Sequence, residues 1–406
     1  RRAGITVLLA GPLQARKLAL APAPPAPVLT LERAGLLARP GPAASPLTDP
    51  GQPAYILFTS GSTGVPRGVT MSHGAGLAFA RWAVAHVGLN ASDRCANHAP
   101  LTFDLSTFDL YATLLARGTV VIVPPAMSAF AASLGGYIER QRVTTWYSVP
   151  SALVDLLDAG ALQGRDLSPL RRVIYAGEPF PVERLRRLMA LLPHAAFYNF
   201  FGPTETNVCC AHRLPGPPPD GARDVPIGAV CEGLTGVVLD DAGREADRGE
   251  LYVAGPTVMS GYWDAPAATA AALVQLPGRA GTFCRTGDRV IVDADGRLHF
   301  AGRVDHMVKV GGYRVELQEV ERSLGQDPAV GEACAVTRSA ATGGSELVCF
   351  VVPRPGERID ADALRRRLRE RLPGYMIPAH VLARDALPRT PSGKLDRQAL
   401  ARDAAS

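Results

Sequence analysis

Residues 59–68, Thr-Ser-Gly-Ser-Thr-Gly-Val-Pro-Arg-Gly, have the composition of a loop that binds a polyphosphate. They follow an apolar run at residues 55–58, so the pattern predicts a loop that leaves a strand. Glycines leave backbone N–H groups accessible, and hydroxyl groups add further donors for phosphate oxygens. The spacing differs from that of a Walker loop, which ends in Gly-Lys-Ser/Thr. A surface loop rich in small polar residues remains an alternative.

Four later segments combine charged or hydroxyl side chains with glycine turns. They are residues 199–206, 285–288, 302–316 and 388–397. The first places Glu205 after a Gly-Pro turn, the second places Asp288 after a glycine, and the last holds Lys394 in a tight turn. Each segment alone is compatible with ordinary turn residues, paired carboxylates or a solvated lysine.

The bulk composition argues against several classes of protein. A chain of 406 residues suggests two or three domains, and 47% hydrophobic with 20% charged residues is ordinary for a globular protein. The net charge of +5 is mild, and the arginine-rich segment 365–371 has a charged helical pattern, so no nucleic-acid partner is expected. The seven cysteines lack Cys-x-x-Cys spacing, which favours a reducing, cytoplasmic location. No apolar run approaches the roughly 18–20 residues that span a bilayer, so no membrane association is expected.

Alternating strand and helix patterns predict an α/β fold with mostly parallel strands. Strands are expected at residues 119–123, 143–149 and 172–175, and helices at residues 133–141, 151–158 and 182–192. From about residue 225, shorter strands separated by turns at residues 240–243 and 293–296 predict an antiparallel subdomain. Helices expected at residues 316–324 and 360–372 belong to a further α+β unit, whereas the Pro- and Ala-rich stretch 21–53 predicts little regular structure. We therefore expect three units at residues 1–224, 225–302 and 303–406.

In this order, the five segments resemble the adenylate-forming superfamily of acyl-CoA synthetases, luciferase-like enzymes and nonribosomal peptide synthetase adenylation domains. Phe-Gly-Pro-Thr-Glu-Thr at residues 201–206 and Pro-Ser-Gly-Lys-Leu-Asp-Arg at residues 391–397 are typical of the amino-acid-adenylating branch. The resemblance implies a large N-terminal domain of parallel-sheet α/β subdomains with a small β-barrel-like subdomain. A hinge at Asp305 joins it to a mobile α+β C-terminal domain. Relatives carry a further portion before the phosphate loop, so the chain is expected to be N-terminally truncated.

The resemblance also implies a two-step reaction. ATP and a carboxylate give an acyl adenylate and pyrophosphate, with Mg²⁺ as the metal, and the acyl group then passes to a thiol. Cations and hydrogen-bond donors must therefore meet the charge that develops on the α-phosphate. The implied ATP-binding residues are Thr59, Ser60, Gly61, Ser62, Thr63, Gly64, Arg67, Gly177, Glu178, Phe201, Asp288 and Arg303.

Three further residues have implied roles in catalysis. Glu205 ligates Mg²⁺, Thr204 contacts the α-phosphate, and Lys394 bridges that phosphate and the substrate carboxylate. Rotation of the C-terminal domain about Asp305 then withdraws Lys394 and brings residues 309–312 toward the entry of the thiol.

Within the nucleotide site, Phe201 is implied to stack on adenine, the backbone at Gly177 and Glu178 lines the adenine site, and Asp288 accepts the ribose hydroxyls. Two positions depart from the family, because Arg67 and Gly311 stand where relatives usually carry Lys and Arg.

The segment Phe-Asp-Leu-Ser at residues 103–106 matches the start of the family's amino-acid pocket. Asp104 is implied to bind the α-ammonium group, which favours an amino acid over a fatty or aryl acid because a buried carboxylate needs a cation. From the local sequence alone, a turn or helix-cap carboxylate is the simpler interpretation. The other implied pocket residues are Leu105, Phe108, Tyr147, Ile174, Ala176, Phe200, Val208 and Cys209, together with Lys394.

These pocket residues predict a small substrate without a second charge, since a charged side chain would find no partner. The set is similar to that of free-standing prolyl-AMP ligases, which load L-proline onto a carrier protein. Proline is compact and apolar and carries a secondary ammonium, so L-proline is the expected substrate. Phe200 is larger than expected for that group, which leaves alanine or glycine as the alternative if it narrows the pocket. A phosphopantetheinylated carrier protein acting in trans is the expected partner, because no carrier segment follows Arg397.

Other interpretations stay open at this point. A D-alanine:carrier-protein ligase or an acyl-CoA synthetase belongs to the same superfamily, although the latter should lack an acidic residue at position 104. An inactive nucleotide-binding fragment is a third possibility, against which the presence of Lys394, Glu205 and Asp288 argues.

Overall fold

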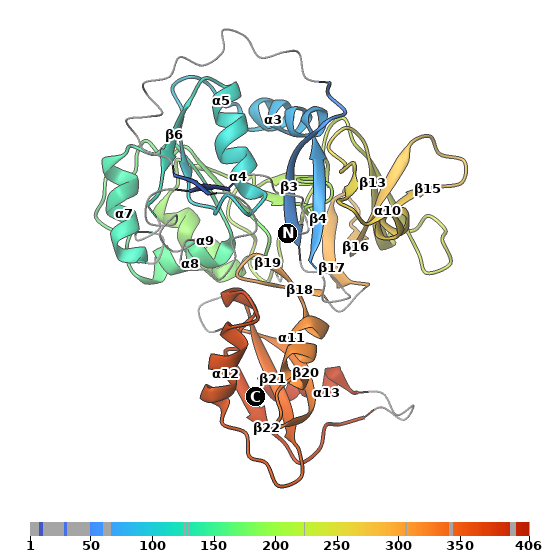
Figure 1. The fold of residues 1–406 in the computed structure, drawn as a ribbon. Coiled ribbons are helices and arrows are strands. Elements are labelled where there is room, and N and C mark those ends of the chain that lie inside the picture. The colour runs from blue at the N-terminus through green and yellow to red at the C-terminus, as the bar shows by residue number, and fades with distance from the viewer. Residues whose placement is uncertain are drawn as a thin grey trace.

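The computed structural model describes residues 8–10, 28–30, 49–59, 66–124, 127, 130–222, 224–304, 307–340, 344–389 and 395–405. Figure 1 shows a large part coloured blue to light orange and a smaller part coloured orange to red, which meet at strands β18 (Met307–Val310) and β19 (Tyr313–Glu316). The mixed α/β architecture with a separate C-terminal part confirms the predicted fold class. None of the helices in these ranges combines the length and apolarity needed to cross a bilayer.

A seven-stranded sheet forms the centre of the large part, in the order β11-β10-β9-β8-β7-β5-β6. Its parallel strands are β5 (Arg94–Asn97), β6 (Thr119–Ile122), β7 (Thr145–Ser148), β8 (Arg172–Ala176) and β9 (Ala196–Phe201). Two antiparallel strands, β10 (Cys210–Arg213) and β11 (Ala229–Val230), extend one edge. The strands predicted near residues 119–123, 143–149 and 172–175 are therefore confirmed.

Helices cover both faces of this sheet and bury separate apolar clusters. The helices are α3 (His73–Val87), α7 (Ala131–Arg140), α8 (Pro150–Asp158) and α9 (Val182–Leu191), with α4 (Leu105–Thr107), the π-helical turn η1 (Phe108–Ala112) and α5 (Thr113–Leu115) continuous with one another. One cluster contains Leu134, Leu153 and Leu185 from α7, α8 and α9. The other contains Phe79 of α3 and Phe108 of η1.

Parallel strands end at the same edge of a sheet, so the loops that follow them converge there. The loops after β7, β8 and β9 therefore bring Val149, Gly177 and Thr204 to one edge. The turn between β18 and β19 lies beside this edge, where the Gly312 N–H donates to Glu178.

Antiparallel strands build the rest of the large part. They are β12 (Thr235–Leu239), β13 (Arg248–Ala254), β15 (Leu273–Gln275), β16 (Thr282–Val292) and β17 (Leu298–Arg303) in one sheet, and β3 (Pro53–Thr59), β4 (Arg67–Ser72) and β14 (Gly261–Tyr262) in another, with α10 (Pro266–Ala272) alongside. The turns predicted at residues 240–243 and 293–296 are confirmed, because the N–H groups of Gly243 and Gly296 bond to Asp240 and Asp293 carbonyls. The stretch with little predicted structure does contain β2 (Val28–Thr30), which pairs with β1 (Leu8–Ala10).

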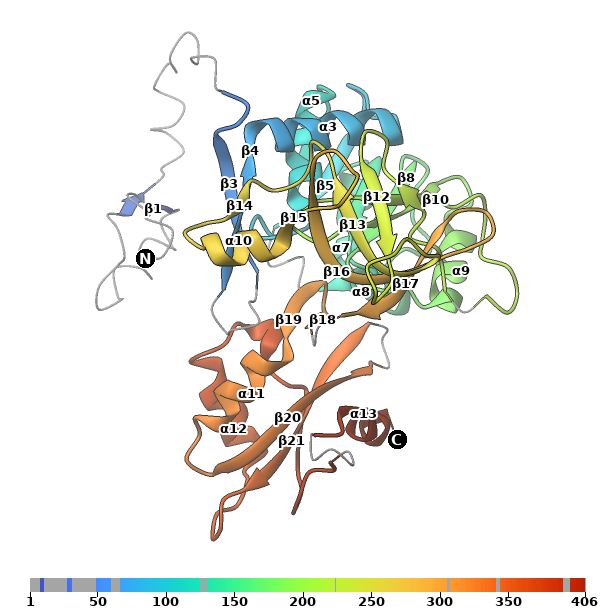
Figure 2. The same cartoon turned by 90° about the vertical axis from the view of Figure 1, so that its right-hand side faces the viewer.

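The smaller part has a three-stranded sheet, β20 (Val330–Ser339), β21 (Ser345–Pro353) and β22 (His380–Ala383). Helices α11 (Leu317–Gly325) and α12 (Ala361–Arg369) pack on one face, while α13 (Arg397–Ala405) packs on the other, as Figure 2 shows. A short 3₁₀ turn, η2 (Gly374–Met376), carries Tyr375 toward the large part.

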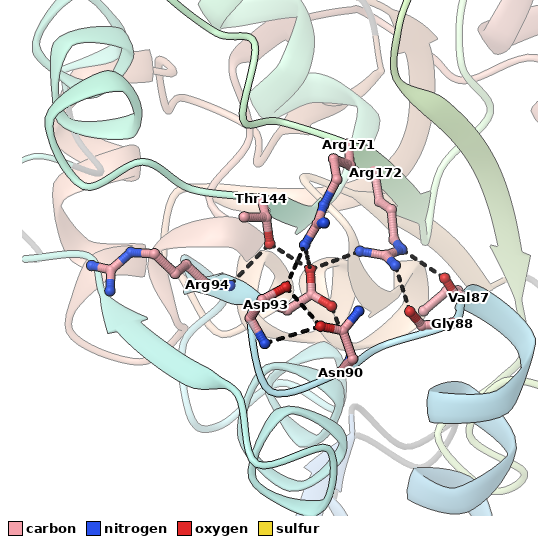
Figure 3. Close-up of polar contacts among 9 residues, drawn as sticks. Val87, Gly88, Asn90, Asp93, Arg94, Thr144, Arg171 and Arg172 are labelled. Carbon is pink, nitrogen blue, oxygen red and sulfur yellow. Dashed lines mark hydrogen bonds and ion pairs between the residues drawn. The ribbon is translucent and has the colours of Figure 1, made fainter.

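A buried carboxylate ties together the amino-terminal ends of the central strands (Figure 3). Asp93 accepts hydrogen bonds from Thr144 at 2.7 Å, Arg171 at 2.8 Å and Arg172 at 2.7 Å. Arg172 also donates to the carbonyls of Val87 and Gly88 at the end of α3. This network holds α3 against β5, β7 and β8 at the end of the sheet opposite to the converging loops.

Candidate functional site

A pocket lies between the carboxyl edge of the central sheet and the hairpin of β18 and β19. Nine of the predicted site residues line it: Thr59, Asp104, Leu105, Tyr147, Ala176, Gly177, Thr204, Val208 and Arg303. These residues come from β7, β8, α4 and the loops after β5, β8 and β9 at the edge of the central sheet, and from β3 and β17 of the two antiparallel sheets.

Asp104 lies in this pocket immediately before α4, and its carboxylate forms no capping hydrogen bond with that helix. Burial raises the pKa of Asp104, and the nearby negative charge of Glu205 raises it further. A hydrogen bond from the Thr204 hydroxyl and the positive charge of Lys309 act in the opposite direction. The net pKa lies above the ordinary value. An ammonium group placed against this carboxylate would stabilise its ionised form.

Aromatic side chains form the wall beyond Asp104. Tyr147 is buried, and its ring lies edge-on to Phe108 at 5.2 Å and to Phe200 at 5.9 Å between centroids. Burial and the negative charges of Asp104 and Asp109 raise the pKa of Tyr147, so its phenol is neutral. This wall is therefore apolar apart from one hydroxyl group.

The remaining predicted pocket residues divide between two clusters. Ile174, Phe108 and Phe200 belong to the same cluster as Tyr147 but do not line the first pocket. Cys209 lies instead with Phe201 in the cluster under the antiparallel sheet. Side chains along a strand alternate between its faces, and this separates Phe200 from Phe201 on β9.

A second pocket adjoins the first, and its lining includes Gly177, Glu178, Phe201 and Lys309. The Lys309 ammonium lies 5.1 Å from the centre of the Phe201 ring. Asn199 also lines this pocket, and it donates to the Pro226 carbonyl at 2.9 Å. Motif reasoning did not assign Asn199 a role, although it begins the segment that contains Thr204 and Glu205.

Asp288 forms a buried ion pair with Arg303, with 2.5 Å between Oδ1 and Nη1. Its other oxygen, Oδ2, is buried and accepts no hydrogen bond within the described part of the chain. A carboxylate oxygen left without a donor fits a ligand that supplies hydroxyl groups, such as a ribose diol.

Glu205 is 3% exposed, and its Oε1 accepts a hydrogen bond from the Tyr262 hydroxyl at 2.6 Å. The guanidinium of Arg67 lies 5.5 Å from the centre of the Tyr262 ring. No three His, Cys, Asp or Glu side chains gather as a metal cluster in the ranges given above. A single buried carboxylate fits Mg²⁺, which takes its other ligands from phosphates and water.

Several predicted residues lie outside the described ranges: Ser60, Gly61, Ser62, Thr63, Gly64, Asp305 and Lys394. The residues flanking the phosphate loop are described, and Thr59 pairs with Arg67 across β3 and β4. The segment 59–68 therefore begins and ends on the two strands of a hairpin.

The turn between β18 and β19 contacts the large part directly. The Gly312 N–H donates to Glu178 Oε1 at 2.7 Å. Tyr313 stacks on Phe103 with 5.3 Å between ring centroids, and on Tyr375 at 4.1 Å. Lys309 and Gly312 thus line the pocket, whereas Arg389 and Leu395, the described residues that flank Lys394, do not.

Known proteins share both the sequence and the fold. Residues 3–263 match the AMP-binding enzyme family, and residues 319–394 match the AMP-binding enzyme C-terminal domain. The L-proline--[L-prolyl-carrier protein] ligase of Streptomyces coelicolor is 41% identical over 342 residues, 81% of this chain and 62% of that protein. The ligase of the same name from Pseudomonas fluorescens is 41% identical over 325 residues, 79% of this chain and 63% of that protein.

The structural comparison extends over nearly the whole chain. An adenylation domain of Vibrio cholerae, solved in complex with glycyl-adenosine-5′-phosphate, matches with a TM-score of 0.80 and 26% identity, covering 98% of this chain and 75% of that one. The chain spans a little over three fifths of the length of the two ligases. It belongs to the AMP-binding enzyme family, with both the main and the C-terminal domain of that family present.

Proposed function

We propose that this protein activates a small amino acid, L-proline, as its aminoacyl adenylate and transfers it to the phosphopantetheine thiol of a separate carrier protein. The observation that carries the proposal is the Asp104 carboxylate, which lies in the pocket beside Thr204 and next to the aromatic wall that contains Tyr147. The names of the two ligases support the substrate and the carrier. The route served is the biosynthesis of a pyrrole-type or other nonribosomal peptide product, in the cytoplasm.

In the first step, a carboxylate oxygen of the amino acid attacks the α-phosphorus of ATP. The bond to the bridging oxygen of the β-phosphate breaks, and pyrophosphate leaves with its electron pair. Two anions must approach each other, so positive charge and donors around the α-phosphate lower the barrier. Thr204 and Lys394 have this role, and residues 59–64 with Arg67 hold the departing phosphates.

Glu205 would hold Mg²⁺, which supplies positive charge to the phosphates when bound. Its buried position beside Tyr262 suits one carboxylate ligand whose orientation is held by a hydrogen bond. Asp288, with Oδ2 unpaired in the described structure, would accept the ribose hydroxyls, and Phe201 would lie against adenine.

In the second step, the sulfur of the carrier thiol attacks the acyl carbon of the adenylate. A thioester forms, AMP leaves with the electron pair of the broken C–O bond, and the thiol proton is released. The hairpin at Lys309 and Gly312 lines the pocket in the orientation expected for this step. Asp305 is the proposed hinge for the change of orientation.

The shape and charge of the pocket support a compact substrate. Asp104 pairs with the ammonium, while Tyr147, Leu105, Ala176 and Val208 offer no partner for a second charge. Proline carries a secondary ammonium and an apolar ring, which these walls accommodate.

Amino-acid-dependent exchange of labelled pyrophosphate into ATP tests the proposal, with L-proline, D-alanine and glycine compared. Exchange is expected to be strongest with L-proline, and the product should load a phosphopantetheinylated carrier. Strongest exchange with D-alanine would transfer the assignment to a D-alanine:carrier ligase. Exchange supported only by fatty or aryl acids with CoA as acceptor would indicate an acyl-CoA synthetase. No exchange with any acid would contradict the proposed activation step and favour an inactive protein.

A further inference from the structure

The carboxylate of Glu178 lies at the contact between the two parts of the molecule. It is 8% exposed and follows Gly177, whose positive φ of 93° turns the chain after β8. Oε1 accepts the Gly312 N–H at 2.7 Å, and Oε2 accepts the Ser151 N–H at 3.2 Å. One carboxylate therefore receives a backbone donor from each part.

The described contacts of the Glu178 carboxylate are with backbone N–H groups. None of the ion pairs between described residues includes Glu178. Ser151 lies in the first turn of α8, where the exposed N–H groups and the helix dipole favour a negative charge. This half of the arrangement belongs wholly to the large part and does not depend on the position of the hairpin.

The other half depends on the hairpin. Gly312 approaches so closely that a Cβ atom there would lie 2.2 Å from Val149 Cγ1. Gly344, from the segment before β21, lies close as well, since a Cβ atom there would be 3.5 Å from both Glu178 oxygens. Two segments of the C-terminal part therefore converge on the same carboxylate.

We propose that Glu178 is a positioning residue that selects the orientation in which the β18–β19 hairpin faces the pocket. The inference rests on the proposed two-step function, in which this orientation serves the transfer of the aminoacyl group. When the hairpin leaves, Glu178 keeps its bond to Ser151 and loses only the bond to Gly312. Its interaction free energy therefore differs between the two orientations, which is the condition for shifting their populations.

The expected shift follows from the strength of such a bond. A hydrogen bond to a charged acceptor changes an equilibrium by about 10- to 100-fold. Replacing Glu178 by Ala should lower the population of the hairpin-docked orientation by about that factor. Glu178→Gln should have a smaller effect, because its amide oxygen still accepts from Gly312 while its NH₂ group cannot accept from Ser151.

Fluorescence energy transfer between two dyes measures this population directly, in nucleotide-free full-length protein. Cysteines introduced at the exposed positions Gln163 and Glu357 would carry the dyes, since all seven native cysteines are buried. Glu183→Ala is the matched control, because it removes an exposed carboxylate whose ion pair among the described residues is with Arg186 of the same helix, α9.

The expected result is a lower docked population in the order wild type, Gln, Ala, with the Glu183→Ala protein unchanged. A second readout is the ratio of carrier loading to pyrophosphate exchange with L-proline, which should fall with the docked population. An unchanged energy-transfer distribution in Glu178→Ala would overturn the inference. If the Ala variant does not fold, an unchanged distribution in Glu178→Gln would overturn it. Absence of exchange in the wild type would count against the proposed function alone, because the dye measurement needs no turnover.

Discussion

The hydroxyl of Tyr262 donates a hydrogen bond of 2.6 Å to Oε1 of Glu205, a residue 57 positions earlier in the chain. Both side chains are buried, and Tyr262 lies on β14, which pairs with the strand that carries Arg67. The bond fixes the rotation of the carboxylate that is proposed to hold Mg²⁺. Neighbours that orient a metal ligand commonly contribute 10- to 100-fold to metal affinity.

We therefore expect Tyr262→Phe to raise the Mg²⁺ concentration for half-maximal pyrophosphate exchange by about tenfold. The phenyl ring keeps its place under the Arg67 guanidinium, so packing is preserved. Tyr252→Phe is the control. It removes a tyrosine hydroxyl that donates a hydrogen bond of 3.3 Å to Glu250, and Tyr252 does not line the pocket. An equal change in both variants would show that Tyr262 acts on the fold in general.

Replacing Asp104 by Asn should weaken binding of the amino acid while stabilising the folded protein. Removing one member of a buried charge pair costs about 3–5 kcal/mol, so the Kd of the amino acid should rise by at least 100-fold, measured by calorimetry. Burial raises the pKa of Asp104 in the folded protein, which means that ionising it disfavours the folded state. The free energy of unfolding therefore falls as pH rises through this raised pKa, and the Asn variant should be more stable than wild type at pH 7. A less stable Asn variant would contradict this account.

Gly312→Ala should reduce carrier loading more than pyrophosphate exchange. Its Cβ would lie 2.2 Å from Val149 Cγ1, and the residue has a φ of 76° that alanine rarely adopts. Such overpacking costs about 1–3 kcal/mol, equivalent to about 5- to 150-fold in docking. Adding Val149→Ala should restore the part of the loss that is steric.

Gly356→Ala provides the control for backbone strain. Its φ of 82° is similar, but no atom lies within 4 Å of a Cβ at that position. If this variant impairs loading as strongly as Gly312→Ala, backbone strain rather than the contact with Val149 is responsible.

Asp93→Asn should destabilise the whole large part. Burial alone would raise the pKa of Asp93. Hydrogen bonds from Thr144, the Asn90 backbone and Arg171, together with the charge of Arg172, lower this pKa below its usual 3.8 (Figure 3). Because the folded pKa is depressed, this stability is present above pH 4 and is lost as pH falls through the folded value. We expect a loss of about 3 kcal/mol at pH 7 in urea unfolding.

The acid dependence supplies the check on Asp93. The difference between wild type and Asp93→Asn should narrow below pH 4, because protonation removes the same charge. Asp166→Asn is the control, since Asp166 is exposed and, among the described residues, its carboxylate accepts hydrogen bonds from Ser168. A difference that persists unchanged in acid would mean that packing, rather than charge, is at stake.

The sequence by itself determined the class of fold and the types of residue at the site. Strand and helix periodicities identified β6, β7 and β8 with their helices, because each pattern is local and repeats within a few residues. Glycine turns beside Glu205 and Asp288, and the polar loop after β3, were visible for the same reason. The family resemblance ordered these segments along the chain.

Only the tertiary structure decided which side chains meet. Tyr262 reaches Glu205, and Gly312 reaches Glu178 across 134 positions, through strand pairing and packing that no local pattern encodes. The placement of Cys209 with Phe201 rather than with the pocket wall depends on which side of the sheet each residue faces. Contacts of this kind depend on the packing of elements distant in sequence, so the mostly parallel α/β arrangement could be predicted while the partner of each buried polar atom could not.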